Sequence, residues 1–529
     1  MLSLLVALPA VGALVVTVLP RSRPSLAKQL TLGFSVATFL LSLGLLLGFE
    51  PGGENYQFAE SYEWIPAFGV HWSLGVDGIG LVLVGLTTVL TPIVIGAAWR
   101  DMDPEPDPDT LIGSSTEPAP DAGRRHPARR SVNGYFALML VLEAMAIGVF
   151  AATDVFVFYV FFEAMLVPMY FLIGRYGGPQ RSYAAVKFLL YSLVGGLLML
   201  AAVVGLFVLS SRAGEGTFLL SELQDLEIAT STQRWLFLGF FVAFAIKAPM
   251  WPVHTWLPDA AAQSTPAGAV LLVGILDKVG TFGMIRYCLT LFPDASRYFS
   301  PVIVTLAVIG VLYGALVAIG QTDLQRLVAY TSISHFGFIT LGIFAMTSTS
   351  QSGSTLYMVN HGFSTAALFL VVGFLASRRG SRLVTEFGGV QKVAPVLAGV
   401  FLFAGLSALS LPGLSTFVSE FMVLVGSYSR FSLLTILATL GIVLASLYVL
   451  LMYQRTMTGP VSPSVERMTD LSMRERLVIA PVVAVIVALG FFPGPVLDVI
   501  NPAVTATLEH AGVSDPEPPV AVPSGEESE

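Results

Sequence analysis

Fourteen long apolar stretches are the feature that most constrains how this chain can fold. They are centred near residues 10, 38, 89, 142, 163, 195, 243, 275, 309, 335, 366, 408, 442 and 484. A helix needs about 20 mainly apolar residues to cross the hydrocarbon core of a bilayer. Backbone N–H and C=O groups find no water there, so they must bond within a helix or a closed barrel. The sequence therefore predicts an all-α integral membrane protein with about 14 transmembrane helices.

Composition supports a membrane protein. Only 12% of the 529 residues are charged and 55% are hydrophobic, whereas about 25% of the residues of a soluble domain are charged. The first apolar stretch has neither a basic leader nor a small-residue cleavage site, so we expect a first membrane span and not a signal peptide.

Several chemistries have no visible site in the sequence. Cys288 is the single cysteine, which excludes an internal disulfide and argues against an iron–sulfur cluster, because such clusters normally need four cysteines. The chain contains no phosphate-binding P-loop, no dinucleotide-binding glycine turn and no H-E-x-x-H zinc motif. We therefore expect no cofactor, no metal ion and no catalytic residue of a redox reaction in this chain.

Composition and apolar periodicity divide the chain into segments. The predicted segments are residues 1–100 with transmembrane helices 1–3, a disordered polar loop at 101–130, a five-helix unit at 131–292 (helices 4–8), a second at 298–455 (helices 9–13), helix 14 at 470–497, and a C-terminal tail at 498–529 that is polar and disordered from about 513. The fourth helix of each unit is interrupted by proline, in AIKAPMWP and in ALSLPGLS. Because five is odd, the two units must be inverted repeats, and paired broken helices in such repeats point to a transport pathway near the midplane.

The distribution of basic residues predicts the orientation. With the N-terminus outside, nineteen of the 27 Lys and Arg residues fall in connections on the inner side, five fall on the outer side, and three lie within or at the edges of spans. Cytoplasmic connections carry an excess of Lys and Arg. Both termini are therefore predicted on the outer face of the membrane.

Nine ionisable side chains lie inside or at the edges of the predicted spans. A charge at the bilayer centre costs about 2.5–3.5 kcal/mol on insertion scales, so such residues usually face the protein interior and serve a function. The plainer alternatives are a lysine that extends to the headgroups and a histidine that is simply packed in the core. The nine are Glu143, Glu163, Lys187, Lys247, Asp277, Lys278, His335, His361 and Glu420.

For six of the nine, the sequence favours a functional role. Lys247 precedes three prolines, and a lysine that only anchored a helix would not need the broken backbone beside it. The others lie in the middle of spans or in the second broken helix: Glu163, Lys278, His335, His361 and Glu420. Two histidines in consecutive spans favour a proton relay, since imidazole both accepts and donates a proton near neutral pH.

For the other three, the sequence leaves the role more open. Asp277 is about 100° around the helix from Lys278, so the two should not share a face, and Asp277 is as compatible with a structural pairing as with function. Lys187 lies near the inner end of its span, where an anchor and a relay residue are equally expected. Glu143 is in mid-span, with function slightly favoured.

These residue types suit a switch of protonation. Bringing a charge within about 4–6 Å of another group, or removing it, changes a pKa by about 1–3 units, each about 1.36 kcal/mol. Moving one charge against 100 mV costs about 2.3 kcal/mol. A Glu–Lys pair that opens and closes is thus strong enough to drive a proton uphill, provided that another protein supplies the energy.

Six motifs in order resemble the antiporter-like subunits of respiratory complex I, and most closely their M-type branch, the counterpart of the fourth mitochondrial ND subunit. The resemblance covers roughly residues 70–495 and is carried by FYVFFEAMLVPMYFLIGRYGG, AFAIKAPMWPVHTWLPDA, LDKVGTFGMIR, AYTSISHFGFI, HGFSTAALFLVVG and LSLPGLSTFVSEF. The resemblance implies a subunit that translocates a proton and is not catalytic alone, while NADH, FMN, iron–sulfur clusters and quinone belong to other subunits. It implies L-type and N-type antiporter-like chains as partners, with the lipid bilayer around them and no nucleic acid.

The resemblance also implies roles for individual residues. Glu163 and Lys247 match the switching pair, and Lys278, His335 and His361 match the relay along the middle of the membrane. Glu420 matches the residue that passes the proton outward; the position is usually lysine in the sister chains and glutamate in the M-type branch. Glu143 matches a fourth-helix glutamate less tightly.

Three departures from the family pattern limit this transfer. Ala261 stands where the family commonly has histidine, Asp277 precedes Lys278 where an apolar residue is commoner, and the loop at 101–130 is extra. The alternatives left open are a subunit of an Mrp-type cation/proton antiporter, a subunit of a membrane-bound hydrogenase, and a purely structural spacer in a membrane arm.

Overall fold

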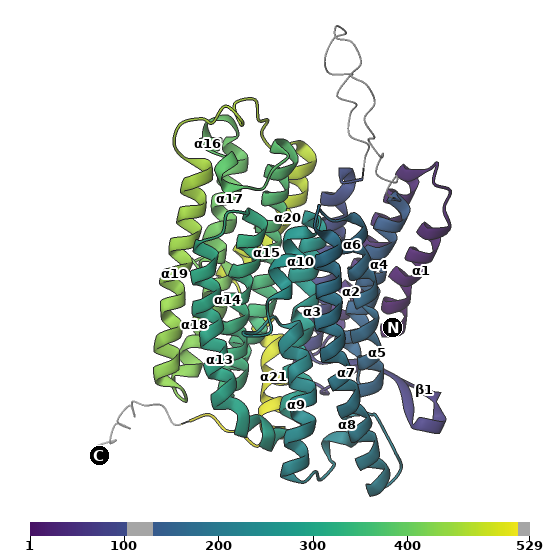
Figure 1. The fold of residues 1–529 in the computed structure, drawn as a ribbon. Helices are drawn as coiled ribbons and strands as arrows, with labels where there is room; N and C mark the ends of the chain where they lie inside the picture. The colour runs from purple at the N-terminus through teal and green to yellow at the C-terminus, as the bar shows by residue number, and fades with distance from the viewer. Residues whose placement is uncertain (103–130, 517–529) are drawn as a thin grey trace, which may run out of the picture.

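The computed structural model describes residues 1–102 and 131–516. Most of the predicted polar loop, from residue 103 to 130, and the end of the predicted tail, from residue 517, lie outside the described residues. Long helices run roughly parallel through the molecule (Figure 1). The helical prediction is confirmed.

The first half of the chain forms a helical bundle with one β-hairpin. Its helices and strands are α1 (Leu2–Val18), α2 (Pro24–Gly48), β1 (Gln57–Ile65), β2 (Val70–Val76), α3 (Gly78–Ala97), α4 (Val132–Ala151), α5 (Val155–Ala164), α6 (Leu166–Tyr176), α7 (Arg181–Ala213), α8 (Leu220–Gln224), α9 (Thr230–Lys247) and α10 (Trp256–Gln263), with short 3₁₀ turns η1 (Pro66–Phe68) and η2 (Ala98–Arg100).

The second half continues the bundle. It consists of α11 (Pro266–Leu271), the π-helical turn η4 (Leu272–Leu276), α12 (Lys278–Gly283), the π-helical turn η5 (Met284–Leu289), α13 (Pro293–Ile319), α14 (Leu324–Ala345), α15 (Ser348–Arg379), the 3₁₀ turn η6 (Val384–Glu386), α16 (Val390–Val393), α17 (Pro395–Ala408), α18 (Ser415–Tyr428), α19 (Ser432–Met457), α20 (Met473–Phe491) and α21 (Gly494–His510).

Ten helical segments among the described residues are long and apolar enough to cross a membrane, or eleven if α20 and α21, bent by 70°, are taken together. α1 and α17 are apolar but shorter. Several predicted spans are divided into two helices, as in α9–α10 and α17–α18, and neither half is among these ten segments. The total of fourteen spans and the inverted repeats stay predictions.

Both proline-containing segments are interrupted. The first break separates α9, which ends at Lys247, from α10, and the second separates α17 from α18. Proline has no backbone N–H and clashes with the preceding turn, so it ends a helix. In the first break, the indole N–H of Trp256 donates to the backbone O of Ile246 at 2.8 Å and so replaces one of the missing helical bonds.

Helices at the centre of the bundle carry most of the intramembrane charges. The segment from α11 to η5 and helix α14 are fully buried, and α15 is 94% buried, whereas α2 and α19 are only 28% and 33% buried. Leucine and valine side chains on the outer faces of α7 and α19 are exposed, as expected for helices that face lipid. Charges on the central helices are therefore shielded from lipid.

Two elements were not predicted from the sequence. β1 and β2 form an antiparallel hairpin in which Tyr62 pairs with Trp72. α21 occupies residues that were assigned to the edge of helix 14 and the tail. It buries Ile500, Val504 and Leu508, which are four residues apart, and packs against α3 and α15.

Candidate functional site

Lys247 is the last residue of α9 and is buried with 1% of its surface exposed. Its Nζ has no hydrogen-bond partner among the described residues. The ammonium lies 4.7 Å from the centroid of the Phe162 ring, a distance at which the negative face of an aromatic ring attracts a cation. In this state, Lys247 is held by an aromatic ring and by no carboxylate.

Glu163 lies near the end of α5, one helical turn before Pro168 interrupts the α5–α6 span. Its Oε1 is buried without a partner among the described residues, and no ion pair joins it to Lys247 within the described chain. The carboxylate packs against α7 so closely that a Cβ on Gly196 would lie 1.8 Å from Oε1. Glu163 and Lys247 are close enough to interact electrostatically, but they form no direct ion pair. We call this arrangement the open pair.

Lys278 and His361 are in direct contact. Nζ of Lys278 lies 2.7 Å from Nδ1 of His361, on α15, and donates to the backbone O of Val273 at 2.5 Å. The carbonyl of Val273 is available because the N–H of Asp277 bonds to Leu272, five residues back, as in a π-turn. π-turns are rare and occur frequently at functional sites.

A line of polar side chains continues from His361 to Glu420. The rings of His361 and His335 are edge to face, with centroids 5.2 Å apart. The ring of Tyr357 lies 5.8 Å from that of His335, and its hydroxyl donates to Oε2 of Glu420 at 2.7 Å. Ser410, in the second helix break, donates to the same oxygen at 2.6 Å. Its φ of 60° is uncommon for a residue other than glycine.

Asp277 is completely buried, and neither of its carboxyl oxygens has a hydrogen-bond partner among the described residues. It interacts electrostatically with both Lys247 and Lys278. Buried polar groups are nearly always bonded to protein or water. Asp277 therefore lies within electrostatic reach of both lysines, in a site that requires water or a movable partner.

The remaining two predicted residues lie apart from this line. Glu143, on α4, accepts a 3.3 Å hydrogen bond from Ser35 on α2, and its other oxygen has no partner among the described residues. Lys187, on α7, donates to Asp259 on α10 at 2.7 Å, and Asp259 also accepts from Arg326 on α14 at 2.6 Å. Lys187 thus belongs to a charge network that joins the two halves of the bundle.

Sequence reasoning missed two residues of the site. In the sequence, Tyr357 looks the same as an aromatic residue of the core, although its spacing of four residues from His361 places both side chains on one helix face. His254 lies in the first break, is 2% exposed, and has no partner for either ring nitrogen among the described residues. It interacts electrostatically with Lys187. A histidine within the same broken stretch as Lys247 was the available signal.

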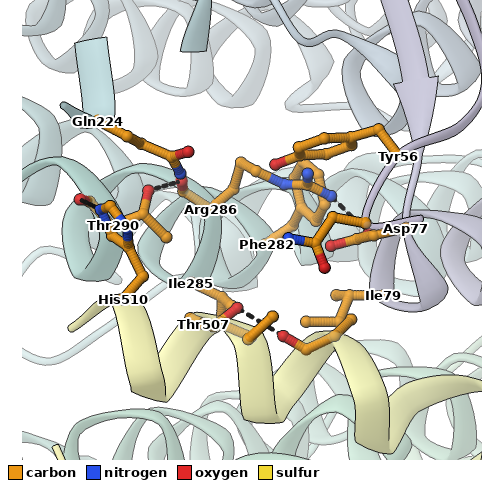
Figure 2. Close-up of a pocket in the computed structure, with 13 residues that line it drawn as sticks. Tyr56, Asp77, Ile79, Gln224, Phe282, Ile285, Arg286, Thr290, Thr507 and His510 are labelled. Atoms are coloured by element: carbon orange, nitrogen blue, oxygen red, sulfur yellow. Dashed lines mark hydrogen bonds and ion pairs between the residues drawn. The ribbon is translucent and has the colours of Figure 1, made fainter. Parts of the chain in front are cut away.

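A second polar region lies where η5 meets the start of α3, α21 and the residues before β1. Figure 2 shows the guanidinium of Arg286 between Tyr56 and Asp77, with His510 and Thr507 of α21 on another side. The cavity has a volume of about 80 Å³, and Nη2 of Arg286 lies 2.6 Å from Oδ1 of Asp77. A polar cavity of this size can hold a few waters.

The arrangement consists of groups that can carry protons. Lysine, histidine, tyrosine and carboxylate side chains all exchange protons, and a water can bridge neighbours that do not touch. Within the described part of the chain, no cluster of His, Cys, Asp or Glu side chains is placed to hold a metal ion. The line from Lys278 to Glu420 runs from α12 to α18, the second half of the second broken helix.

Comparisons with known proteins agree with this arrangement. Residues 152–446 match the family described as "NADH:quinone oxidoreductase/Mrp antiporter, TM". The chain is 54% identical to "NADH-quinone oxidoreductase subunit M" of Mycobacterium tuberculosis (strain ATCC 25618 / H37Rv), over 99% of this chain and 96% of that protein.

Solved structures have the same fold. A chain of "Respiratory complex I from Thermus thermophilus with bound NADH" superposes with a TM-score of 0.84 and 31% identity, over 97% of this chain and all of that one. A chain of the Mrp complex from Dietzia sp. DQ12-45-1b gives a TM-score of 0.81 over 96% of this chain and 99% of that one, with 20% identity, a likeness of fold alone. The chain therefore belongs to the NADH:quinone oxidoreductase/Mrp antiporter family of membrane proteins.

Proposed function

We propose that this chain translocates protons across the membrane as a subunit of an NADH:quinone oxidoreductase. The observation that carries the proposal is the buried line Lys278–His361–His335–Tyr357–Glu420, which runs from α12 by way of α15 and α14 to α18 through groups that can each take and give a proton. A structural core has no need to bury these groups next to one another.

The open Glu163–Lys247 pair is the proposed switch. Closing the pair would hold the ammonium charged, and opening it favours release of the proton towards Asp277 and Lys278. When the Glu163 carboxylate is not paired with Lys247, the contact with the Phe162 ring stabilises the ammonium group. The proline break beside Lys247 leaves backbone groups that need water or polar neighbours, and His254 lies in that break.

The energy for transport comes from redox chemistry in other subunits. The relatives at high identity are named as subunits of NADH–quinone oxidoreductases, and we propose L-type and N-type antiporter-like chains as neighbours in the membrane arm. NADH, FMN, iron–sulfur clusters and quinone would be bound by the other subunits. The chain alone would catalyse no redox reaction.

We further propose that the end of the molecule with both termini faces the outside of a bacterial inner membrane. The excess of arginine and lysine in the opposite connections supports this orientation. Cys288 is the single cysteine and is buried, so one cysteine introduced by Ser221→Cys or Ser381→Cys can be labelled selectively. A maleimide that cannot cross membranes should label Ser221→Cys in intact spheroplasts and Ser381→Cys only in inverted vesicles; the reverse pattern would overturn the orientation.

The test of function uses inverted membrane vesicles that contain the whole enzyme with Lys247→Ala. NADH-driven quinone reduction and proton uptake should both fall at least tenfold, because the two processes are coupled, while the amount of assembled complex stays unchanged. Lys392→Ala, an exposed loop lysine outside the spans, is the matched control and should behave as wild type. Wild-type rates in assembled Lys247→Ala enzyme would favour a structural spacer, and sodium-dependent transport by the isolated chain would favour an Mrp-type antiporter.

A further inference from the structure

A groove of about 600 Å³ opens on the surface of the bundle between α2, α3 and α20. Leu32, Pro92, Ile93 and Leu477 form its apolar walls, and Trp99 and Arg474 lie at one end. Trp99, in the turn η2 that continues α3, is seven residues after Pro92, which corresponds to about 10 Å along the helix axis. The groove is therefore apolar along its length and amphipathic at one end only.

Positive charge is concentrated at that end. Nη1 of Arg474 donates to the backbone O of Ala97 at 2.8 Å, while its Nε is buried with no hydrogen-bond partner in the described residues. Nζ of Lys28 lies 6.0 Å from the Trp99 ring, and Glu475, Arg100, Asp101 and Arg378 all act electrostatically on Arg474. Arg378 and Glu475 form an ion pair with each other. Among the described residues, basic side chains therefore outnumber acidic ones around the mouth of the groove.

We propose that this groove binds one anionic phospholipid, with an acyl chain along the apolar walls and the phosphate at Arg474. Three observations on the groove fit that occupant. Its apolar length suits a hydrocarbon chain, its tryptophan lies where aromatic rings gather at membrane interfaces, and its basic end complements a phosphate. Basic pockets between transmembrane helices are sites where anionic headgroups bind.

The inference requires that the chain span a membrane, and it is independent of the proposed proton pathway. None of the residues of the Lys278–Glu420 line contributes to the groove. Loss of the lipid and loss of proton transport can therefore be measured separately.

The experiment compares lipid retained by the purified whole complex. The complex is delipidated, mixed with equal amounts of phosphatidylglycerol and phosphatidylcholine that carry the same acyl chains, washed in detergent, and analysed by mass spectrometry for lipid per complex. Arg474→Gln removes one cation, and Leu32→Trp fills the groove without changing charge. Their controls are Arg476→Gln, an exposed arginine on the same helix, and Leu40→Trp, which is 59% exposed on α2 and outside the groove.

The wild-type complex should retain phosphatidylglycerol over phosphatidylcholine, and both controls should retain it equally well. Arg474→Gln should weaken retention of phosphatidylglycerol about fivefold, the effect of one basic group near an anionic headgroup, and Leu32→Trp should abolish one molecule of bound lipid. Equal retention by Leu32→Trp and Leu40→Trp would overturn the proposal. So would a cross-link from Leu477→Cys to a neighbouring subunit, because the groove would then be a protein interface.

Discussion

Individual side chains in the candidate pathway are distinguished by the hydrogen bonds that they lack. Lys247 Nζ, both oxygens of Asp277 and both ring nitrogens of His335 are buried without partners among the described residues. His335 lies near the backbone O of Ala408 but makes no well-formed hydrogen bond to it. Unpaired buried polar groups cost about 1–3 kcal/mol each, so their concentration along one line indicates sites for water and for moving protons.

Tyr357→Phe should interrupt the pathway at a single atom. The change removes the hydroxyl that donates to Glu420 and keeps the ring in place. A hydrogen bond to a charged group contributes about 1.5–3 kcal/mol, so NADH-driven proton uptake should fall about tenfold or more in vesicles with normal amounts of complex. Tyr448→Phe is the control, because the Tyr448 hydroxyl is buried and has no hydrogen-bond partner among the described residues; equal rates in the two variants would remove Tyr357 from the pathway.

The variant Asp277→Asn should show whether the Asp277 carboxylate, which interacts with both lysines, is needed for transport or only for structure. Asparagine has the same shape but no charge, and a nearby charge changes the pKa of its neighbours by about 1–3 units. We expect assembled complex whose quinone reduction and proton uptake fall about tenfold, with recovery in Asp277→Glu. If Asp277 were only structural, replacing this unpaired carboxylate would leave both rates unchanged and could raise thermal stability.

Helices position these groups through close packing. α7 approaches α5 at Gly196, where the absence of a side chain makes room for the carboxylate of Glu163. The neighbouring Gly195 faces Ala243 and Ile246 of α9 in the same way, with an added Cβ 3.1–3.2 Å from both. Two adjacent glycines thus bring α7 against both members of the open pair.

Gly196→Ala should displace Glu163 without weakening helix α7. Alanine is a better helix former than glycine by about 1 kcal/mol, but its Cβ would occupy the position of Oε1. Proton uptake should therefore fall as far as in Glu163→Gln, with complex still assembled. Gly399→Ala on α17, where an added Cβ meets no atom within 4 Å, should keep wild-type transport. Normal transport in Gly196→Ala would mean that the position of Glu163 is not critical.

The two halves of the molecule are joined by ion pairs at the end opposite the β-hairpin. Asp259 on α10 lies between Lys187 on α7 and Arg326 on α14, so one carboxylate links the first half to the second. Arg382, after α15, donates to the backbone O of Ala262 on α10 and so adds a second link. A proton pathway that crosses from one half to the other requires that the two halves keep a fixed relative position.

Asp259→Ala should weaken this connection between the halves. Exposed pairs contribute about 0–1 kcal/mol, and breaking a fully buried one costs about 3–5 kcal/mol. These partly exposed pairs should fall between, at about 2 kcal/mol of unfolding free energy. Thermal unfolding of the purified protein should shift down accordingly, while Glu222→Ala, an exposed acid on α8, should leave it unchanged. A midpoint equal to wild type would show that the two halves do not depend on Asp259.

The helical architecture could be predicted from the sequence, because long apolar runs are local signals. Isolated charges within those runs identified the six main candidate residues, whose roles stay predictions. The π-turns could not be predicted, because the angle of 100° between successive side chains holds only for an uninterrupted α-helix. η4 ends directly before Asp277 and Lys278, whose relative orientation was predicted with that angle. Tyr357 was missed because its role depends on Glu420, 63 residues away. The separation of Glu163 from Lys247 depends on how α5, α7 and α9 pack, which no local pattern specifies.

The two described ends of the chain are tied to the same end of the bundle. The N-terminal ammonium pairs with Glu60 of the β-hairpin, and Asp515 accepts a hydrogen bond from the N–H of Ser348 at the start of α15. Both ends of the described chain lie towards the lower side of Figure 1. A chain whose two ends share one aqueous compartment crosses a membrane an even number of times, as the predicted fourteen spans require. We therefore expect reporters fused to either terminus to give the same signal, and opposite signals would contradict the predicted topology.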